Sequence, residues 1–347
     1  MSYTNGLDKP SDYFSTKLYT GNGSTNAITG VGFQPDWVWC KARSYNDDHF
    51  TFDAVRGVTK HIRTNSDSAE VTNTNSLTAF GSDGFTLGSD GGANSNTDTY
   101  ASWNWLAGNG TASNSNGSIT STVSANTTSG FSIVSYTGTG SNATVGHGLG
   151  VAPAMIIIKC RSRAEEWVVY NQGLGNAYAI PLHLTEAKST SATFWQNTNP
   201  SSSVFYIGAN NKHNQSGQTF IAYCFSEKKG FSKFNSYTGN GNNDGTFIYT
   251  GFKPAWVLIK RTDTTSNWLL FDNKRAYSYN LISATLKPNT NGAEDTNGAY
   301  NNVDFISNGI KLRQSNGDLN ASGGSYIYHA FAENPFVTST GIPTTAR

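Results

Sequence analysis

The sequence predicts an all-β protein built from three tandem β-sandwich domains, and three observations support this class. Aromatic residues make up 13% of the chain, while charged residues make up only 14%. Abundant Gly, Ser, Thr and Asn separate short runs of β-branched and aromatic residues, which is typical of sandwiches and barrels. One strand-like stretch also occurs three times, beginning at Pro35, Pro153 and Pro254.

The repeated stretch has the same plan in every copy. The proline is followed by one small or polar residue, by four mostly apolar residues, and then by a lysine. Proline can open a strand without removing a ladder hydrogen bond. The run behind it is apolar at successive positions, which indicates a strand covered on both faces. Three copies of one strand predict three copies of one domain, which we call repeats 1, 2 and 3.

A polar residue follows each of these prolines by eighteen positions, as Asp53, Asn171 or Asp272. Apolar residues alternate before it, so the segment is predicted to be a half-buried strand. We interpret the polar residue as a hydrogen-bond acceptor at a strand end or turn. Arg56 and Arg275 lie three residues later in repeats 1 and 3, and they are the expected partners of the two aspartates.

Every repeat also contains an opening, a penultimate and a closing strand. The opening strands are predicted at 14–19, 131–136 and 231–237, the penultimate strands at 84–88, 204–208 and 309–312, and the closing strands at 100–105, 220–225 and 326–331. The sixth residue of the closing strand is Trp105, Phe225 or Phe331. A large side chain there in all three copies predicts a common core position.

The repeats set the expected domain boundaries. The expected units are 1–107 (N-terminal arm and repeat 1), 108–117 (flexible Gly/Ser/Asn linker), 118–227 (repeat 2), 228–334 (repeat 3) and 335–347 (C-terminal tail). Each unit has the size of one β-sandwich, immunoglobulin-like or jelly-roll, and we favour a jelly-roll-like sandwich.

Bulk composition argues against several classes of protein. The formal net charge is +1 and no basic stripe is present, which disfavours phosphate-dominated nucleic-acid binding. No apolar run reaches the roughly 18 residues of a membrane span. Residues 1–6 lack the basic and apolar regions of a signal peptide. The protein is therefore expected to be made in a cytoplasm and not to insert into a membrane.

The titratable residues predict no catalytic residue, metal site or cofactor. Cys40, Cys160 and Cys224 lack metal-ligand or disulfide spacing and are expected to be small buried residues. The histidines form no metal motif or catalytic triad; His329 is expected in a core and His147 in an exposed turn. A glycosidase needs two carboxylates about 5–10 Å apart, whereas the recurring aspartates fall in different repeats.

Binding residues are expected in the stretches that differ between the repeats. These stretches are 58–81, 175–203 and 276–307, and they contain the candidate binding residues Trp195, Tyr277, Tyr279 and Tyr300. Amide and hydroxyl groups around an aromatic face suit a neutral sugar. Two alternatives compete with this interpretation. In one, Trp195 is an ordinary strand residue; in the other, the stretches pack against neighbouring subunits.

Several of these segments resemble an uncharacterised repeat family. The matching residues are Asp12-Tyr13-Phe14 with Tyr19–Gly23, the strand after Pro35, Asp83–Gly88 and Tyr100–Trp105, with similar segments at 118–140, 220–241 and 334–347. The family is common in virion-associated proteins of marine tailed bacteriophages, including cyanophages and pelagiphages. The resemblance covers nearly the whole chain. It implies a structural or adhesive particle component and brings no catalytic residues to assign.

Composition and resemblance together predict a non-enzymatic virion protein that is made in the host cytoplasm and displayed on the particle exterior. A tail-fibre or receptor-binding protein is the first expectation. The alternatives are a capsid decoration or head-fibre protein and a stand-alone carbohydrate-binding module. The expected partners are the protein itself as a homotrimer, other virion proteins and a host surface glycan, because few charges guard the sheet edges and apolar residues such as Phe336 and Ile342 need a partner surface.

Overall fold

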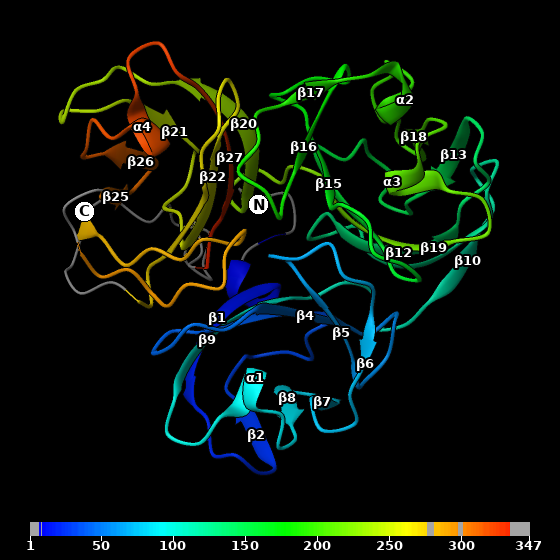
Figure 1. Ribbon diagram of the computed structural model, residues 1–347, viewed down its shortest axis with the longest axis horizontal. Coiled ribbons are helices and arrows are strands. Elements are labelled where there is room, and N and C mark those ends of the chain that lie inside the picture. Colours follow the sequence, from blue (N-terminus) through cyan, green and yellow to red (C-terminus); the bar gives the residue numbers. More distant parts are fainter. Residues whose placement is uncertain (1–6, 8, 276–280, 298–300, 334–347) are drawn as a thin grey trace.

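The computed structural model describes residue 7 and residues 9–275, 281–297 and 301–333. Nearly all regular structure in these residues is β-strand, arranged in antiparallel sheets, which confirms the predicted all-β class. The repeats form three lobes around a common centre rather than a row (Figure 1). None of the described helices has the length and apolar character needed to cross a membrane.

Repeat 1 forms the blue and cyan lobe of Figure 1 and contains a larger and a smaller sheet. The larger sheet, ordered β1-β9-β3-β4-β5-β6, comprises β1 (Phe14–Thr20), β3 (Trp37–Ala42), β4 (His49–Asp53), β5 (Lys60–Arg63), β6 (Val71–Thr72) and β9 (Thr99–Trp105). The smaller sheet, ordered β2-β8-β7, comprises β2 (Asn26–Thr29), β7 (Leu77–Gly81) and β8 (Gly84–Leu87). The short helices are η1 (Pro10–Asp12) and α1 (Gly91–Asn94).

Repeat 2 forms the green lobe and repeats this plan with additional strands. Its larger sheet, ordered β10-β11-β12-β19-β14-β15-β16-β17, comprises β10 (Ala112–Asn114), β11 (Ser121–Asn126), β12 (Phe131–Thr137), β14 (Met155–Cys160), β15 (Val168–Asn171), β16 (Tyr178–Pro181), β17 (Ser189–Thr190) and β19 (Thr219–Phe225). Its smaller sheet pairs β13 (Ala143–Gly146) with β18 (Val204–Ile207). The helices are α2 (Ala192–Trp195) and α3 (Asn211–Asn214).

Repeat 3 forms the yellow to red lobe and has two four-stranded sheets. The sheet facing the centre, ordered β20-β27-β22-β23, comprises β20 (Ser232–Thr238), β22 (Trp256–Arg261), β23 (Trp268–Asp272) and β27 (Ser325–Phe331). The other sheet, ordered β21-β26-β25-β24, comprises β21 (Phe247–Tyr249), β24 (Leu281–Ile282), β25 (Val303–Ile306) and β26 (Gly309–Leu312). The helix α4 (Gly317–Asn320) precedes the closing strand.

The predicted flexible linker at 108–117 is partly a strand. Ala112 to Asn114 form β10, which pairs with β11 so that Ala112 lies opposite Val123. The backbone N–H of Gly108 donates to Ser124 Oγ at 3.0 Å. The Gly, Ser and Asn composition predicted flexibility, but ladder pairing uses main-chain groups that every such residue carries. The composition therefore did not reveal this strand.

The strand after each repeated proline begins two residues later, as β3, β14 or β22. Every residue of β3 is buried. Val38 and Cys40 belong to a core between the two sheets of repeat 1. Trp37 and Trp39, on the opposite face, belong to a core that includes residues of all three repeats. The prediction of a strand covered on both faces is therefore confirmed.

The shared core lies where the three lobes meet. Trp105, Phe225 and Phe331 end the closing strands β9, β19 and β27. Their rings form a closed triangle, with centroids 6.4, 5.6 and 5.5 Å apart. The predicted common core position is confirmed, and equivalent residues of the three repeats touch one another there. Each such aromatic pair adds about 0.5–1.5 kcal/mol beyond area burial, so the repeats stabilise one another around an approximate three-fold axis.

A buried asparagine holds the turn after the opening strand in each repeat. Asn94, Asn214 and Asn320 end the helices α1, α3 and α4. Their Oδ1 atoms accept from the turn's backbone N–H at 3.0, 2.8 and 2.9 Å. The turn in repeat 1 has no room for a residue larger than glycine at position 21, because a Cβ on Gly21 would lie 2.0 Å from Ser95 O.

Candidate functional sites between the repeats

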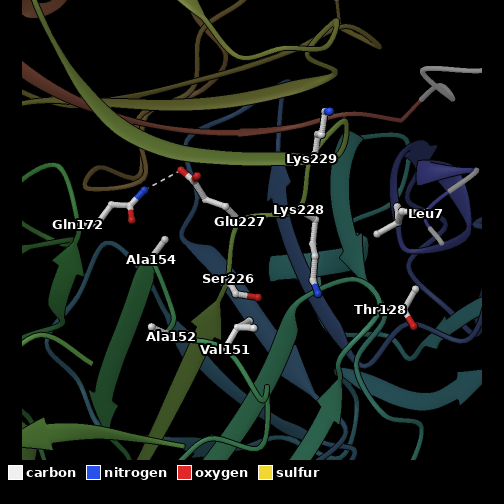
Figure 2. Close-up of a pocket in the computed structure, with 10 residues that line it drawn as sticks. All are labelled: Leu7, Thr128, Val151, Ala152, Ala154, Gln172, Ser226, Glu227, Lys228 and Lys229. Carbon is white, nitrogen blue, oxygen red and sulfur yellow. Dashed lines mark hydrogen bonds between the residues drawn. The ribbon is translucent and has the colours of Figure 1, made fainter. Parts of the chain in front are cut away.

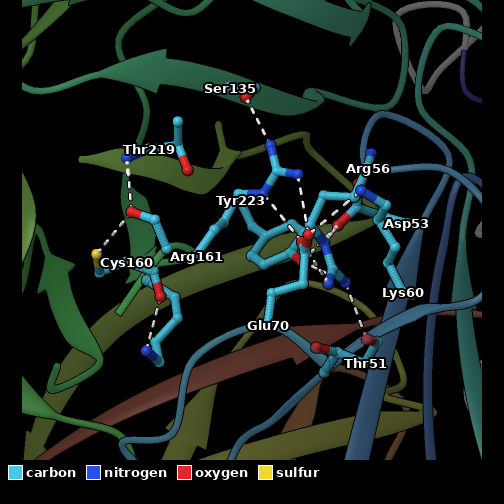
Figure 3. Close-up of polar contacts among 12 residues, drawn as sticks. Thr51, Asp53, Arg56, Lys60, Glu70, Ser135, Cys160, Arg161, Thr219 and Tyr223 are labelled. Atoms are coloured by element: carbon cyan, nitrogen blue, oxygen red, sulfur yellow. Dashed lines mark hydrogen bonds and ion pairs between the residues drawn. The ribbon is translucent and has the colours of Figure 1, made fainter. Parts of the chain in front are cut away.

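The end of β4 in repeat 1 contacts the closing strand of repeat 2 (Figure 3). Arg56 donates from its backbone N–H to Asp53 Oδ1 at 2.8 Å and from Nε to Oδ2. The hydroxyl of Tyr223 on β19 donates to Asp53 Oδ2 at 2.7 Å. The side chains of Asp53 and Arg56 are fully buried. The predicted strand-end acceptor with its arginine is therefore confirmed, and the structure adds a partner from repeat 2.

A second acid extends this contact into a network. Glu70 accepts two hydrogen bonds from Arg161 of repeat 2, at 2.9 and 3.1 Å, and lies 3.4 Å from Arg56 Nη1. Burial acts to raise the pKa of Glu70, but the hydrogen bonds from Arg161 and the charges of both arginines outweigh it and lower that pKa. Glu70 is therefore ionised at neutral pH and links repeat 1 to repeat 2.

The contact between repeats 3 and 1 has the same arrangement. Arg275 donates to Asp272 from its backbone N–H at 3.0 Å and from Nε at 2.6 Å. Trp103 of repeat 1 donates from Nε1 to Asp272 Oδ2 at 2.9 Å. Glu294 accepts from Arg43 of repeat 1 at 2.9 and 3.0 Å and pairs with Arg275 at 2.9 Å.

Among the described residues, the contact between repeats 2 and 3 has no such ion network. Asn171 takes the place of Asp53, Leu174 takes the place of the arginine, and His329 takes the place of Tyr223. Neither ring nitrogen of the buried His329, nor Asn171 Nδ2, has a hydrogen-bond partner among the described residues. Burial lowers the pKa of His329 to about 3, so its ring is neutral at pH 7. The prediction that His329 lies in a core is confirmed.

The divergent stretches lie across the next repeat. Equivalent main-chain hydrogen bonds run from Glu70 to Arg161, from Lys188 to Thr262 and from Glu294 to Arg43, at 2.8, 3.0 and 3.0 Å. Indole groups add to them, because Trp167 and Trp268 donate to the carbonyls of Arg63 and Pro181 at 2.9 Å. Parts of the stretches that we expected to bind a receptor therefore form internal contacts. These contacts join repeats of one chain, so the alternative of packing against neighbouring subunits stays a prediction.

Two residues predicted to be exposed are buried. Trp195 lies in α2, is 2% exposed and donates from Nε1 to Tyr178 O at 2.8 Å. It is therefore neither a sugar platform nor a strand residue, because its ring fills the core of repeat 2. His147 is also buried, and its Nδ1 accepts from the backbone N–H of Leu149 at 3.2 Å. The other candidate binding residues, Tyr277, Tyr279 and Tyr300, lie outside the described residues.

The repeated lysine is buried in every copy. Lys41, Lys159 and Lys260 each donate from Nζ to the carbonyl of the following residue at 2.7 Å. Burial lowers the pKa of each to about 8. A lysine with a lowered pKa can act as a nucleophile. These three, however, line neither the cavity bordered by residues 226–229 nor the one bordered by Gly108 and Gly148, and we interpret them as structural.

The two recurring aspartates, Asp53 and Asp272, do not share a site. They lie at different contacts, and each is enclosed and paired with an arginine. Across the described part of the chain, no three His, Cys, Asp or Glu side chains gather in a way that could hold a metal ion. The three cysteines are free and buried. The polar groups at these contacts join the repeats.

A cavity of about 330 Å³ opens where repeat 2 continues into repeat 3 (Figure 2). The N-terminal arm contributes Leu7, the segment before β14 contributes Val151, Ala152 and Ala154, and the junction contributes residues 226–229. Glu227 accepts from Gln172 Nε2 at 2.7 Å and pairs with Lys233 at 2.8 Å. The lining therefore combines small apolar groups with a few polar ones, as ligand cavities do.

Fold and contacts together define an all-β protein whose three repeats share one core and whose buried charges join those repeats. The chain belongs to the family described as "Domain of unknown function (DUF7483)", whose family model matches residues 9–335. That match extends over all three repeats as one unit, as expected of repeats that share a core. No curated protein and no solved structure matches the chain.

Sequence reasoning missed the second acid and its arginine at both charged contacts. Glu70 follows the recurring aspartate of its repeat by seventeen residues and Glu294 by twenty-two, so no common spacing marks them. Arg43 and Arg161 both follow the repeated proline by eight residues. That spacing was the available signal for the two arginines.

Proposed function

We propose that the protein is a non-enzymatic structural protein of a bacteriophage particle, displayed on the particle exterior as a tail-fibre or receptor-binding protein. The observation that carries the proposal is the contact triangle of Trp105, Phe225 and Phe331, because it gives one chain an approximate three-fold body. Such a body suits attachment at a symmetry axis of a particle. The resemblance to virion-associated proteins of marine bacteriophages supports the particle as its location.

The chemistry of the contacts supports a structural role. The acids Asp53 and Asp272 are fully buried and paired with arginines, so they contribute to assembly of the repeats and not to a reactive surface. Breaking such a buried pair costs roughly 3–5 kcal/mol. The facing sheets in each lobe support a jelly-roll-like sandwich for every repeat. A body held in this way suits a particle component exposed outside the cell.

A capsid decoration or head-fibre protein is the second candidate, and one observation favours it. Trp195 is buried, and parts of the divergent stretches contact neighbouring repeats, so less of their surface is free for a receptor. A decoration protein needs only a rigid body and a docking surface on the particle lattice. A host surface glycan is therefore a proposed partner of the tail-fibre or receptor-binding candidate only.

Self-association and docking onto other virion proteins are part of the proposal. Phe247 and Tyr249 on β21 are 43% and 63% exposed, and β21 is an edge strand of its sheet. An exposed edge with aromatic side chains is a surface on which another chain can pair. We propose a homotrimer or a contact with a second virion protein through this edge.

These proposals are tested by complementing a phage from which the gene for this protein has been deleted. The deletion is complemented with the wild-type protein, with the double variant Phe247→Ser/Tyr249→Ser, or with Val71→Ser, which removes another exposed apolar side chain. Protein per particle, particle stability and host adsorption are measured separately, and cryo-electron microscopy locates the protein. A receptor-binding protein gives lost adsorption when it is absent, whereas a decoration protein gives normal adsorption and fragile particles. Absence from wild-type particles would refute both candidates.

A further inference from the structure

The cavity between repeats 2 and 3 lies beside Ala154, which occupies the place that Asp36 occupies in repeat 1. Both residues follow the repeated proline directly. The backbone N–H of Asp36 donates to Trp105 O at 2.9 Å, and that of Ala154 donates to Phe225 O at 2.7 Å. Their carbonyls accept equivalent bonds from residues 54 and 172, at 2.9 and 2.8 Å. The two positions are therefore structurally equivalent.

In repeat 1 the carboxylate of Asp36 binds the segment that leaves the closing strand. Its Oδ2 accepts from the backbone N–H groups of Ala107 and Asn109, at 2.8 and 3.0 Å. Asp36 is fully buried. Burial raises its pKa, while the two backbone hydrogen bonds act to lower it. Repeat 1 thus contains a carboxylate held by two main-chain donors at this place.

In repeat 2 the corresponding donors have no carboxylate. Glu227 and Lys229 follow Phe225 by two and four residues, as Ala107 and Asn109 follow Trp105. The backbone N–H groups of Glu227 and Lys229 donate no hydrogen bond to any described residue. Ala154 is too short to reach them, and both donor residues line the cavity beside it.

The charges around the cavity favour an anion. Repeat 2 has Lys228 and Lys229 at the positions of Gly108 and Asn109 in repeat 1. Among the described residues, Lys228 Nζ donates to one backbone carbonyl, at 2.5 Å, and Lys229 forms no ion pair. The acid that lines the cavity is Glu227, whose charge is offset by its salt bridge. Main-chain N–H groups next to cationic side chains form a common kind of anion site.

We propose that this cavity binds a small organic carboxylate, whose oxygen accepts from the backbone N–H groups of Glu227 and Lys229 as Asp36 does in repeat 1. The volume of about 330 Å³ limits the ligand to a small molecule. Leu7, Val151 and Ala152 line the same cavity and offer apolar contact to the rest of the ligand. The site is independent of the proposed place on a phage particle.

Acetate is the probe for the first experiment. The thermal unfolding midpoint of the full chain is measured with increasing sodium acetate, with sodium chloride at equal ionic strength, and with acetamide as the neutral analogue. We expect a saturable increase with acetate alone. Saturation-transfer NMR on the wild-type protein detects acetate binding directly. If neither measurement distinguishes acetate from acetamide, the proposal is wrong.

Variants at the two equivalent positions locate the effect. Ala154→Asp supplies the missing carboxylate within the chain, so we expect a higher midpoint without acetate and no response to it. Ala154→Val adds uncharged bulk at the place of the proposed carboxylate and should also remove the response. Asp36→Ala opens the equivalent site in repeat 1, and acetate should restore part of its lost stability. An acetate response that survives both Ala154 substitutions would overturn the assignment.

Discussion

The hydroxyl of Tyr223 in repeat 2 lies 2.7 Å from Asp53 Oδ2 in repeat 1. Trp103 holds the same position in its own closing strand and donates to Asp272 at 2.9 Å. Two different side chains therefore provide one donor to the same kind of buried acid. The third equivalent residue, His329, faces no such acid, so the three contacts between repeats are alike in geometry and unequal in chemistry.

Replacing Tyr223 with Phe removes the donor to Asp53 and keeps the ring. Loss of a hydrogen bond to a buried group costs about 1–3 kcal/mol, so we expect the free energy of unfolding in urea to fall by about that amount. Tyr136→Phe is the matched control, because its buried hydroxyl donates to a neutral carbonyl, that of His213, at 2.7 Å. The control should lose less. Equal losses would show that the charge of Asp53 contributes nothing to the bond.

Arg275→Leu copies Leu174 of repeat 2 and leaves Asp272 and Glu294 without their shared partner. Removing one member of a buried ion pair costs roughly 3–5 kcal/mol, and the thermal midpoint should fall accordingly. The double variant Asp272→Asn/Arg275→Leu copies the pair found in repeat 2. We expect it to recover part of the loss, because a neutral amide is less costly to bury than an unpaired carboxylate. A double variant less stable than the single one would contradict this.

The buried His329 should make the folded protein less stable as the pH decreases below neutral. Burial lowers its pKa to about 3 in the folded chain, whereas an unfolded histidine titrates near about 6.5. The unfolded chain therefore binds the proton first, so stability is complete above about pH 6.5. As the pH decreases further, the free energy of unfolding falls by up to about 1.4 kcal/mol per pH unit until the pH reaches the pKa of the folded state.

Urea titrations between about pH 7 and about pH 5 measure this effect. His329→Gln should give a shallower dependence of the unfolding free energy on pH than the wild-type protein does. His61, whose pKa is lowered to about 4 mainly by burial, acts in the same direction within repeat 1. His61→Gln is therefore the comparison variant. A slope that His329→Gln leaves unchanged would remove His329 from the explanation.

Trp105→Ala should weaken all three repeats together, because the Trp105 ring contacts both Phe225 and Phe331. Truncating a buried aromatic residue costs roughly 3–5 kcal/mol. Calorimetry should show one unfolding transition for the wild-type chain and one, at lower temperature, for the variant. Residues 118–227 expressed alone should fail to fold, because their centre-facing aromatics lose their partners. Separate transitions for the repeats would contradict a shared core.

The sequence by itself determined the features that depend on local spacing. Strand propensity and apolar periodicity predicted the all-β class and the strands after the three prolines. The pairing of Asp53 with Arg56 and of Asp272 with Arg275 also followed from the sequence, because residues three apart at a strand end meet within one turn. The large sixth residue of each closing strand was correctly placed in a core.

Only the tertiary structure decided that the sixth residues of the closing strands share one core. It also decided which residues pack against each buried face. Trp105 has the same sequence signature whether its ring packs within one sandwich or against Phe225 and Phe331. The same holds for Trp195, because an aromatic residue in a polar stretch does not indicate whether it faces solvent or a core. Glu70 and Arg161 meet across ninety-one positions of the chain. Periodicity reports that a face is buried, whereas its partner depends on contacts between distant segments that no local pattern encodes.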